Sequence, residues 1–356
     1  MHLLILNNCM DEEDPVLSHQ IQAVSELNNS FEKVSVLTGK IGKYVKNDRI
    51  EVYSSGWVQD RKIQNIIYFY FTFFKVLIRE KPDAVFSHMT DVQSFLISPI
   101  LKLLRLKHYL WYAHKTYSPW LRMTLPWLTG VFTSTPGSFP LKIEKLYPVG
   151  QAIRHQDFPM RSFNNDYSFN KLIHVGRFDS AKNIHLLIEA ASQFKINFPN
   201  LILTLIGSPS NKFENLYAEK IKFDYSDFET KKWLFFFEKI TRENVSQMLL
   251  DNEIFIHAYK GSLDKTLLEA TLSGLPVVTL NPEYMSIFGS WSKSKKVDVN
   301  FLVDEMTFLT TLSKKDLLSE LAARRELIKS HHSLENWGSS IAKIINYGEN
   351  PTELTL

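Results

Sequence analysis

Two turns in the second half of the sequence combine glycine with charged residues in a way that suits a phosphate ligand. In the first turn, Gly176 and Arg177 follow an apolar run, and Lys182 stands just ahead of a helix expected to begin near Asn183. A cation at a helix N-terminus opposes the helix dipole and costs about 0.3–1 kcal/mol, so Lys182 needs a nearby anion. A diphosphate would supply that anion, and Arg177 could grip its oxygens. The alternative is a pair of solvated surface cations with Asp179 as their partner.

The second turn lies between an apolar run at 254–257 and a helix expected over 266–273, which Gly274 should end as a left-handed cap. Its residues, all candidates for ligand binding, are Gly261, Ser262, Leu263, Asp264 and Lys265. Glycine lets a ligand approach the backbone closely, and the first N–H groups of a helix attract an anion. The side chain of Asp264 is expected to cap the helix.

Glu269 lies about one turn into that second helix, among apolar neighbours. Burial of a carboxylate without partners is unfavourable, and the two vicinal hydroxyls of a ribose would satisfy its oxygens. A salt bridge or a hydrogen bond at the helix end would satisfy them equally well. The residues alone leave both explanations open.

Short apolar runs alternate with stretches of helical period along the whole chain, which is typical of βα units that build parallel sheets. Strands are expected at 2–6, 33–38, 83–87, 108–113, 130–133 and 145–149 in the first half, and at 171–175, 201–206, 233–237, 254–257 and 276–280 in the second. A polar segment at 150–167 suits a linker. The pattern predicts an α/β protein of two Rossmann-like, doubly wound domains, with ligands bound in a cleft at the carboxyl ends of the strands.

Composition excludes several classes of protein. The 356 residues include 41 Lys and Arg against 38 Asp and Glu, a net charge of +3 that is too small for a dedicated nucleic-acid binder. Cys9 is the single cysteine, so a disulfide framework or a cysteine-rich metal site is excluded. With no secretory signal recognisable at the N-terminus, a cytoplasmic location is expected.

The most apolar stretch, 66–74, is flanked by Arg61, Lys62 and Lys75. It is much shorter than the roughly 20 residues that a bilayer-spanning helix needs. Its aromatic and basic residues are compatible with a helix buried against a sheet or with one lying at a membrane interface. Peripheral contact with the inner face of the cytoplasmic membrane through 61–79 therefore stays open.

The motifs together resemble a known family. Gly176 and Arg177 with Lys182, followed by the runs 268–270 and 274–278, resemble the C-terminal donor domain of family 4 (group 1) glycosyltransferases with the GT-B fold. In the first half the resemblance rests on His88, the run 111–115, the run 133–135 and the pair 149–150, each at or after an expected strand. It covers most of the chain.

This resemblance implies retaining transfer of a sugar from a UDP- or GDP-sugar to a glycan or lipid-linked acceptor, in surface polysaccharide or glycoconjugate synthesis, with no cofactor and no required metal. Arg177 and Lys182 would neutralise the leaving diphosphate, His114 would contact the donor sugar, and Glu269 would hold the ribose. Further donor-binding candidates are Gly176, Gly207, Gly261, Ser262, Leu263, Asp264 and Lys265; the acceptor-side candidates are Asn8, His88 and Lys115.

The family pattern also implies an acceptor-binding domain over 1–152, a donor-binding domain over 153–333, and a C-terminal helix within 334–356 that packs back on the first domain. Gly261 departs from that pattern, because many members carry a glutamate there that touches the donor sugar. The identity of that sugar is thus open, with Asp264 and Lys265 as local substitutes.

The loop after the first strand also departs from the pattern, since an acidic cluster at 11–14 replaces the usual glycine pair. A solvated loop is favoured over a metal site there, and His331 and His332 are expected at the surface. Two other functions stay open: a sugar-nucleotide 2-epimerase of the same fold, and a catalytically inactive partner subunit that binds a sugar nucleotide.

Overall fold

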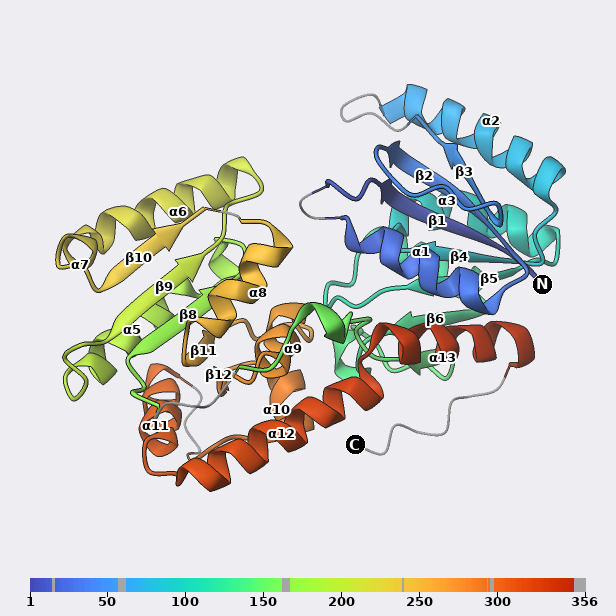
Figure 1. Ribbon diagram of the computed structural model, residues 1–356. Helices are drawn as coiled ribbons and strands as arrows, with labels where there is room; N and C mark the ends of the chain where they lie inside the picture. The colour runs from blue at the N-terminus through green and yellow to red at the C-terminus, as the bar shows by residue number, and fades with distance from the viewer. Residues whose placement is uncertain are drawn as a thin grey trace. The chain divides into compact units, whose positions relative to one another are not determined.

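The computed structural model describes residues 1–14, 17–56, 62–161, 167–238, 240–292, 294 and 298–348, with the side chains of residues 62, 242 and 243 excepted. The chain divides into two compact units. The first unit is Met1–Ala152 together with the chain from His331, and the second is Ile153–Ser330. Each unit is an α/β layer structure built on its own parallel sheet (Figure 1).

The first unit is built on a parallel sheet of seven strands in the described part of the chain. Its spatial order is β3 (Ile50–Ser54), β2 (Lys33–Ile41), β1 (His2–Met10), β4 (Ala84–His88), β5 (Lys107–Trp111), β6 (Gly130–Thr133) and β7 (Leu146–Pro148). The order reverses at β1 and β4, so the carboxyl ends of these two strands flank the point where ligands of doubly wound sheets bind.

Helices cover both faces of this sheet (Figure 1). One face is covered by α1 (His19–Ser30) and α13 (Leu334–Tyr347), which also contact each other. The other face is covered by α2 (Lys62–Glu80), α3 (Asp91–Leu103) and the short α4 (Pro119–Thr124). The central strands are buried on both sides, which explains their continuous apolar runs.

The last helix, α13, completes the core of the first unit although it lies far along the chain from that unit's strands. Ser333 caps its N-terminus by accepting a hydrogen bond from the Asn336 N–H (3.2 Å). Trp337 is fully buried and its ring packs on Phe86, His88 and Trp111. Within the described residues, this is the helix that the family resemblance implies over 334–356; residues 349–356 lie outside them.

The second unit has a parallel sheet of five described strands. Its order is β10 (Leu234–Phe237), β9 (Ile202–Ile206), β8 (Lys171–Val175), β11 (Ile254–His257) and β12 (Val277–Thr279). One face carries α5 (Ile184–Lys195), α6 (Lys212–Asp224) and α11 (Val299–Leu309), with α7 (Ser226–Thr230) beside β10. The other carries α8 (Arg242–Leu250), α9 (Lys265–Leu272) and α10 (Pro282–Phe288), and α12 (Lys314–His331) contributes to both cores.

All eleven expected strands occur, with ends that differ by a few residues, so the predicted class of two doubly wound parallel-sheet domains is confirmed. The strand β3 was not predicted. It is a short edge strand whose residues are half exposed, so it lacks the continuous apolar run that marked the central strands. Of the polar linker expected at 150–167, residues 162–166 lie outside the described part of the chain.

The expected surface position of His332 is wrong. Its side chain is buried in the first unit, and burial lowers the pKa of its imidazole to about 4. The neighbouring Gly150 makes this approach of the chain possible, because a Cβ atom there would lie 2.1 Å from the His331 carbonyl oxygen.

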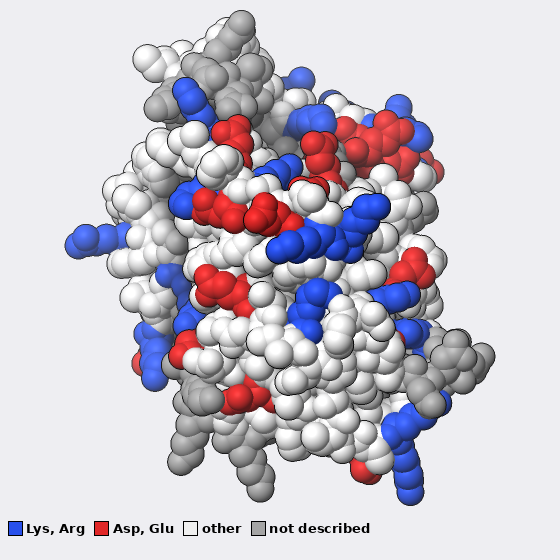
Figure 2. Space-filling view, turned by 90° about the vertical axis from the view of Figure 1, so that its left-hand side faces the viewer, with Lys and Arg blue, Asp and Glu red and all other residues white. Residues whose placement is uncertain are grey.

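Charged side chains of both signs are interspersed on the face of the molecule shown in Figure 2, in keeping with the small net charge. Among the described residues, no helix combines the length and the apolar character needed to cross a membrane.

We predict that Gly150→Ala destabilises the first unit by about 1–3 kcal/mol, because φ is +84° there and the new methyl group would overlap the His331 backbone. The free energy of unfolding in urea measures this loss. Gly348→Ala is the matched control: φ is +70°, but no described atom lies within 4 Å of the added Cβ, so only the backbone strain of about 1 kcal/mol is expected. Equal losses in the two variants would contradict the packing role of Gly150.

Candidate functional site

The carboxyl ends of β8 and β9 approach each other closely through two glycines. The Gly176 N–H donates to the Ile206 carbonyl (3.0 Å), and a Cβ on Gly207 would lie 1.8 Å from the Gly176 carbonyl oxygen. Any side chain at Gly207 would therefore push the two turns apart. Both predicted glycines shape the backbone at the end of the sheet, which is where such folds bind ligands.

A single helical turn at Ser180–Lys182 directs Lys182 toward the loop after β11. Asp179 caps that turn by accepting a hydrogen bond from the Lys182 N–H (3.1 Å). Asn183, at φ 51°, changes the direction of the chain before α5, and its amide donates to the Ala258 carbonyl (3.1 Å). The local fold thus fixes the direction of the lysine through backbone contacts on both sides of it.

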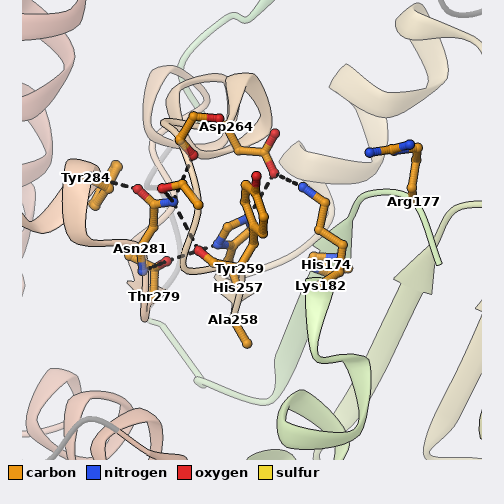
Figure 3. Close-up of polar contacts among 12 residues, drawn as sticks. His174, Arg177, Lys182, His257, Ala258, Tyr259, Asp264, Thr279, Asn281 and Tyr284 are labelled. Carbon is orange, nitrogen blue, oxygen red and sulfur yellow. Dashed lines mark hydrogen bonds and ion pairs between the residues drawn. The ribbon is translucent and has the colours of Figure 1, made fainter. Parts of the chain in front are cut away.

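Lys182 is a buried cation, 7% exposed, so the alternative of a solvated surface lysine is wrong. Its ammonium group forms an ion pair with Asp264 and lies 3.9 Å from the centroid of the Tyr259 ring (Figure 3). A carboxylate and an aromatic face both favour a desolvated ammonium. The anion that the helix start demands is therefore a side chain of the protein itself.

A chain of hydrogen bonds behind Asp264 fixes its orientation (Figure 3). The backbone N–H of Asn281 donates to Thr279 Oγ1 (3.0 Å), which lies 3.1 Å from His257 Nδ1, and His257 Nε2 lies 3.1 Å from Asp264 Oδ2. Because a carboxylate only accepts, Nε2 must donate to Asp264, and Nδ1 then accepts from the Thr279 hydroxyl. A neutral His257 imidazole, with one N–H donor and one acceptor nitrogen, satisfies both hydrogen bonds.

The protonation states follow from burial and from these partners. Burial lowers the pKa of the His257 imidazole, although the hydrogen bond to Asp264 works against that effect. Burial also opposes ionisation of Asp264, but Lys182 and His257 outweigh it and hold the pKa of this carboxyl well below its usual value. At neutral pH the cluster therefore consists of a cation, an anion and a neutral imidazole.

The expectation that the Asp264 side chain caps α9 is wrong. Asp264 stands at the N-cap position, but its carboxylate makes no capping hydrogen bond to the described residues of α9. Lys182 and His257 occupy it instead. The positive end of the α9 dipole therefore keeps its attraction for another anion.

Asn281 is one of several residues of this site that sequence reasoning missed, together with His174, His257, Tyr259 and Thr279. Its buried side-chain amide donates to the carbonyls of Tyr259 and Ser262 (3.0 Å each), and its Oδ1 accepts from the Tyr284 N–H (2.9 Å), which caps α10. One side chain thus ties the loop after β11 to the start of α10. An Asn-Pro pair directly after an apolar run was the available signal, since asparagine before a helix-initiating proline is a common cap.

Gly261 lies under the Tyr259 ring. A Cβ atom at Gly261 would lie 2.0 Å from the end of that ring, so a larger residue there requires Tyr259 to move. Tyr259 in turn covers the Lys182 ammonium. The position where relatives were expected to carry a glutamate therefore belongs here to a tyrosine that packs on the lysine.

Arg177 is exposed and lies at the rim of the cluster. Its guanidinium is 3.5 Å from the carboxylates of Asp179 and Glu214 and 3.4 Å from Ser210 Oγ. The Asp179 and Glu214 carboxylates are mostly buried, but the Arg177 side chain is 58% exposed and the distances are long, so these ion pairs contribute little to stability. The side chain can exchange these partners for a ligand at small cost.

The other donor-side candidates fall into two groups. Ser262 and Leu263 are buried, and the Leu263 side chain packs in the core beneath the loop. Lys265 is the first residue of α9 and is partly exposed, while Glu269 is buried on the same helix. Leu263 can therefore meet a ligand only through its backbone.

His174 is a second buried histidine beside this cluster, 5.8 Å from His257 between ring centroids. Its Nδ1 donates to the Ile256 carbonyl (2.9 Å), and burial lowers its pKa to about 3. The ring lies close beneath Gly176, where a Cβ would be 2.9 Å from Nε2. It supports the glycine turn as a neutral side chain.

The acceptor-side candidates belong to the first unit, at or near the carboxyl ends of β1, β4 and β5. Asn8 donates through its backbone N–H to Gln20 and through its amide to the Met89 carbonyl (3.0 Å each). His88 is buried among the aromatic rings around Trp337. His114 and Lys115 are exposed, and His114 Nδ1 accepts from the Thr116 N–H (3.0 Å).

The acidic cluster at 11–14 is paired with lysines. Lys40 binds Asp11 and Asp14, and Lys43 binds Glu12 and Glu13. In the part of the chain that the structure describes, no three His, Cys, Asp or Glu side chains are grouped as metal ligands.

Comparisons with known proteins agree with this architecture. Residues 156–289, most of the second unit, match the family model of group 1 glycosyl transferases. The chain is similar to the structure of HepE from Anabaena with UDP and glucose (TM-score 0.71, 12% identity, 97% of this chain and 99% of that one). It is also similar to sucrose-phosphate synthase of Thermosynechococcus elongatus, with a TM-score of 0.71 and 14% identity over 97% of this chain and 98% of that one. A third similar structure is WaaG, a glycosyltransferase involved in lipopolysaccharide biosynthesis, with a TM-score of 0.65 and 14% identity over 98% of this chain and 100% of that one.

No curated protein matches the sequence significantly. At 12–14% identity the likeness to the three structures concerns the fold, and it extends over nearly the whole chain. The chain therefore has the GT-B fold of glycosyltransferases, with the group 1 pattern in its second unit.

We predict that Asp264→Asn lowers the free energy of unfolding at pH 7 by about 2–3 kcal/mol, because Lys182 loses its buried anion. Since the pKa of Asp264 is lowered in the folded state, its stabilisation is complete above the unfolded value of about 3.9 and is lost as the pH falls below it. The difference from wild type should shrink accordingly in urea unfolding at decreasing pH. Asp224→Asn, which removes an exposed pair with Lys220, serves as control and should cost less than about 1 kcal/mol; equal costs would contradict the prediction.

Proposed function

We propose that this protein is a retaining, metal-independent glycosyltransferase of family 4, which moves a sugar from a UDP-sugar to a glycan or lipid-linked acceptor. The observation that carries the proposal is the buried Lys182, held beside the start of α9, where the Asp264 side chain makes no capping hydrogen bond to the described residues, and followed at the rim by Arg177. The group 1 match over this region and the UDP held by the structurally similar HepE support the same conclusion.

The proposed reaction needs stabilisation of a leaving diphosphate. The bond between the anomeric carbon and the diphosphate oxygen breaks, the acceptor hydroxyl bonds to the same face of that carbon, and its proton passes to the leaving phosphate. Negative charge grows on the diphosphate, so cations placed in advance lower the barrier. Lys182 has three N–H donors, so it can keep Asp264 and still donate to a phosphate oxygen.

Tyr259 is the proposed substitute for the glutamate of other family members. Its ring lies over Gly261 and packs on Lys182. A donor sugar at this place would meet an aromatic face instead of a carboxylate. We therefore expect a donor preference that differs from that of members with the glutamate.

The remaining assignments are predictions from the family resemblance. Glu269 would bind the ribose, the first unit would bind the acceptor, and His114 would contact the donor sugar, with Asn8, His88 and Lys115 on the acceptor side. A role in surface polysaccharide or glycoconjugate synthesis places the enzyme in the cytoplasm. A lipid-linked acceptor would require work at the membrane surface.

We predict that Arg177→Ala lowers turnover of a UDP-sugar by about 100-fold, of order 3 kcal/mol in activation free energy, because the leaving group loses a charge-assisted partner. Arg177 is exposed, so its loss leaves the core intact. Lys182→Ala should cost at least as much. Release of UDP measures turnover, and Lys220→Ala on the exposed face of α6 serves as control. Near-normal turnover in both test variants would rule out the proposed roles.

A thermal-shift series with UDP, GDP and ADP tests the nucleotide. A ligand at 100 times its dissociation constant adds about 2.7 kcal/mol to the unfolding free energy, and we expect the largest shift with UDP. Incubation with donor alone separates the other functions. Epimerised donor without acceptor indicates the 2-epimerase, and a UDP-dependent shift without turnover on any acceptor indicates the inactive partner subunit.

A further inference from the structure

The outward face of α2 in the first unit is apolar, which is unusual for a helix on the surface of a sheet. Four large side chains on it are mostly exposed: Ile63 (78%), Ile67 (64%), Phe71 (71%) and Ile78 (74%). Together with Phe74 they recur every third or fourth residue, so they form one stripe along the helix. We call these five residues the α2 stripe.

The stripe is separate from the face that attaches α2 to the protein. Phe69, Phe73 and Val76 are buried against the sheet in one core with residues of α3. The Tyr70 hydroxyl also donates to the Leu96 carbonyl of α3 (2.8 Å). The helix is therefore already anchored. Phe74 of the α2 stripe contacts the Tyr70 and Phe73 rings but remains 43% exposed, and the other four side chains of the stripe are 64–78% exposed. A surface helix normally presents polar residues at this position.

The charges beside the stripe are of one sign. Lys75 and Arg79 flank it on the helix, whereas residues 63–79 include no aspartate or glutamate. Glu80, at the end of α2, is buried and bound to Lys33 and Tyr53, and one of its oxygens lies 3.5 Å from Arg79 Nε. The Arg79 side chain remains 64% exposed. An exposed apolar stripe with exposed basic flanks and no exposed acid within 63–79 fits the surface of a bilayer that contains anionic lipids.

The C-terminal end of α3 also carries exposed apolar side chains beside basic ones. The end of α3 carries Leu103 and Leu104, both exposed, between Lys102 and Arg105. Because α2 and α3 both return to the start of a parallel strand, their C-terminal ends lie at the same edge of the sheet. Exposed apolar and basic side chains thus occur at the C-terminal ends of both helices.

We propose that the α2 stripe docks the protein on an anionic membrane surface, with the helix lying in the plane of the interface and Lys75 and Arg79 at the level of the lipid headgroups. Self-association fits the same face less well. A symmetric dimer would bring the stripe against its own copy, and residues 63–79 of that copy contain no aspartate or glutamate to pair with Lys75 and Arg79. Arg61 and the side chain of Lys62, which the sequence adds to this region, lie outside the described residues.

Cosedimentation of the full chain with vesicles tests this proposal. Wild type should bind phosphatidylcholine vesicles containing phosphatidylglycerol, and binding should weaken as salt rises because exposed charges are screened. Ile67→Ser with Phe71→Ser should weaken binding at least about tenfold. Lys75→Glu with Arg79→Glu should weaken it at least about fivefold for each cation removed.

Phe213→Ser is the matched control, because Phe213 is 86% exposed but lies on α6 of the second unit. It should bind vesicles like wild type, and all variants should keep the wild-type melting temperature and UDP release with a soluble acceptor. Absence of wild-type binding, or equal binding by the α2 variants, would overturn the proposal. So would a dimer that dissociates in these variants without any vesicle binding. None of these outcomes bears on the proposed sugar transfer, which is measured in solution.

Discussion

The buried ion pair between Lys182 and Asp264 is the constraint on which the candidate site depends. Two charges removed from water are costly unless each is well partnered, and here the partners come from the carboxyl ends of three neighbouring strands, β8, β11 and β12, and the loops that follow them. Asp179 and Asn183 aim the lysine, Thr279 and His257 orient the carboxylate, and Tyr259 covers the ammonium. Because the Asp264 carboxylate faces the lysine, it makes no capping hydrogen bond to the described residues of α9. The same pair therefore stabilises the loops and keeps a helix dipole available to a ligand anion.

Much of the fold was readable from the sequence because buried parallel strands leave continuous apolar runs. The edge strand β3 was not, since half-exposed residues carry no such run. In the site, Gly176, Arg177, Lys182 and Gly274 were identified from turn chemistry, and Gly274 has the expected left-handed φ of +80°. The ion pair between Lys182 and Asp264 was not predicted from the sequence. Which carboxylate reaches a lysine depends on the neighbouring order of β8 and β11, and hydrophobic periodicity does not contain that order.

Histidine positions show the same limit. His257 and His174 end or interrupt apolar strands, so the sequence presents them as core residues without a role. In the folded chain they stand side by side under the two turns, one orienting Asp264 and the other supporting Gly176. His332 was expected at the surface because it directly precedes the last helix, yet the close approach allowed by Gly150 buries it. Contacts between residues far apart in the sequence determine the position of each of these three histidines, so the local sequence did not predict it.

The membership of α13 in the first unit bears on how the chain folds during synthesis. The second unit is one continuous segment, so it can complete its core as soon as residue 330 has left the ribosome. The first unit has all its strands by residue 148, but the sheet face under Trp337 and Ile341 stays open until α13 emerges. The core of the first unit is therefore completed by a segment that follows the whole of the second unit in the chain, against the usual order in which the N-terminal domain is complete first. Until α13 has been synthesised, the first unit exposes part of an apolar sheet face, to which a chaperone could bind.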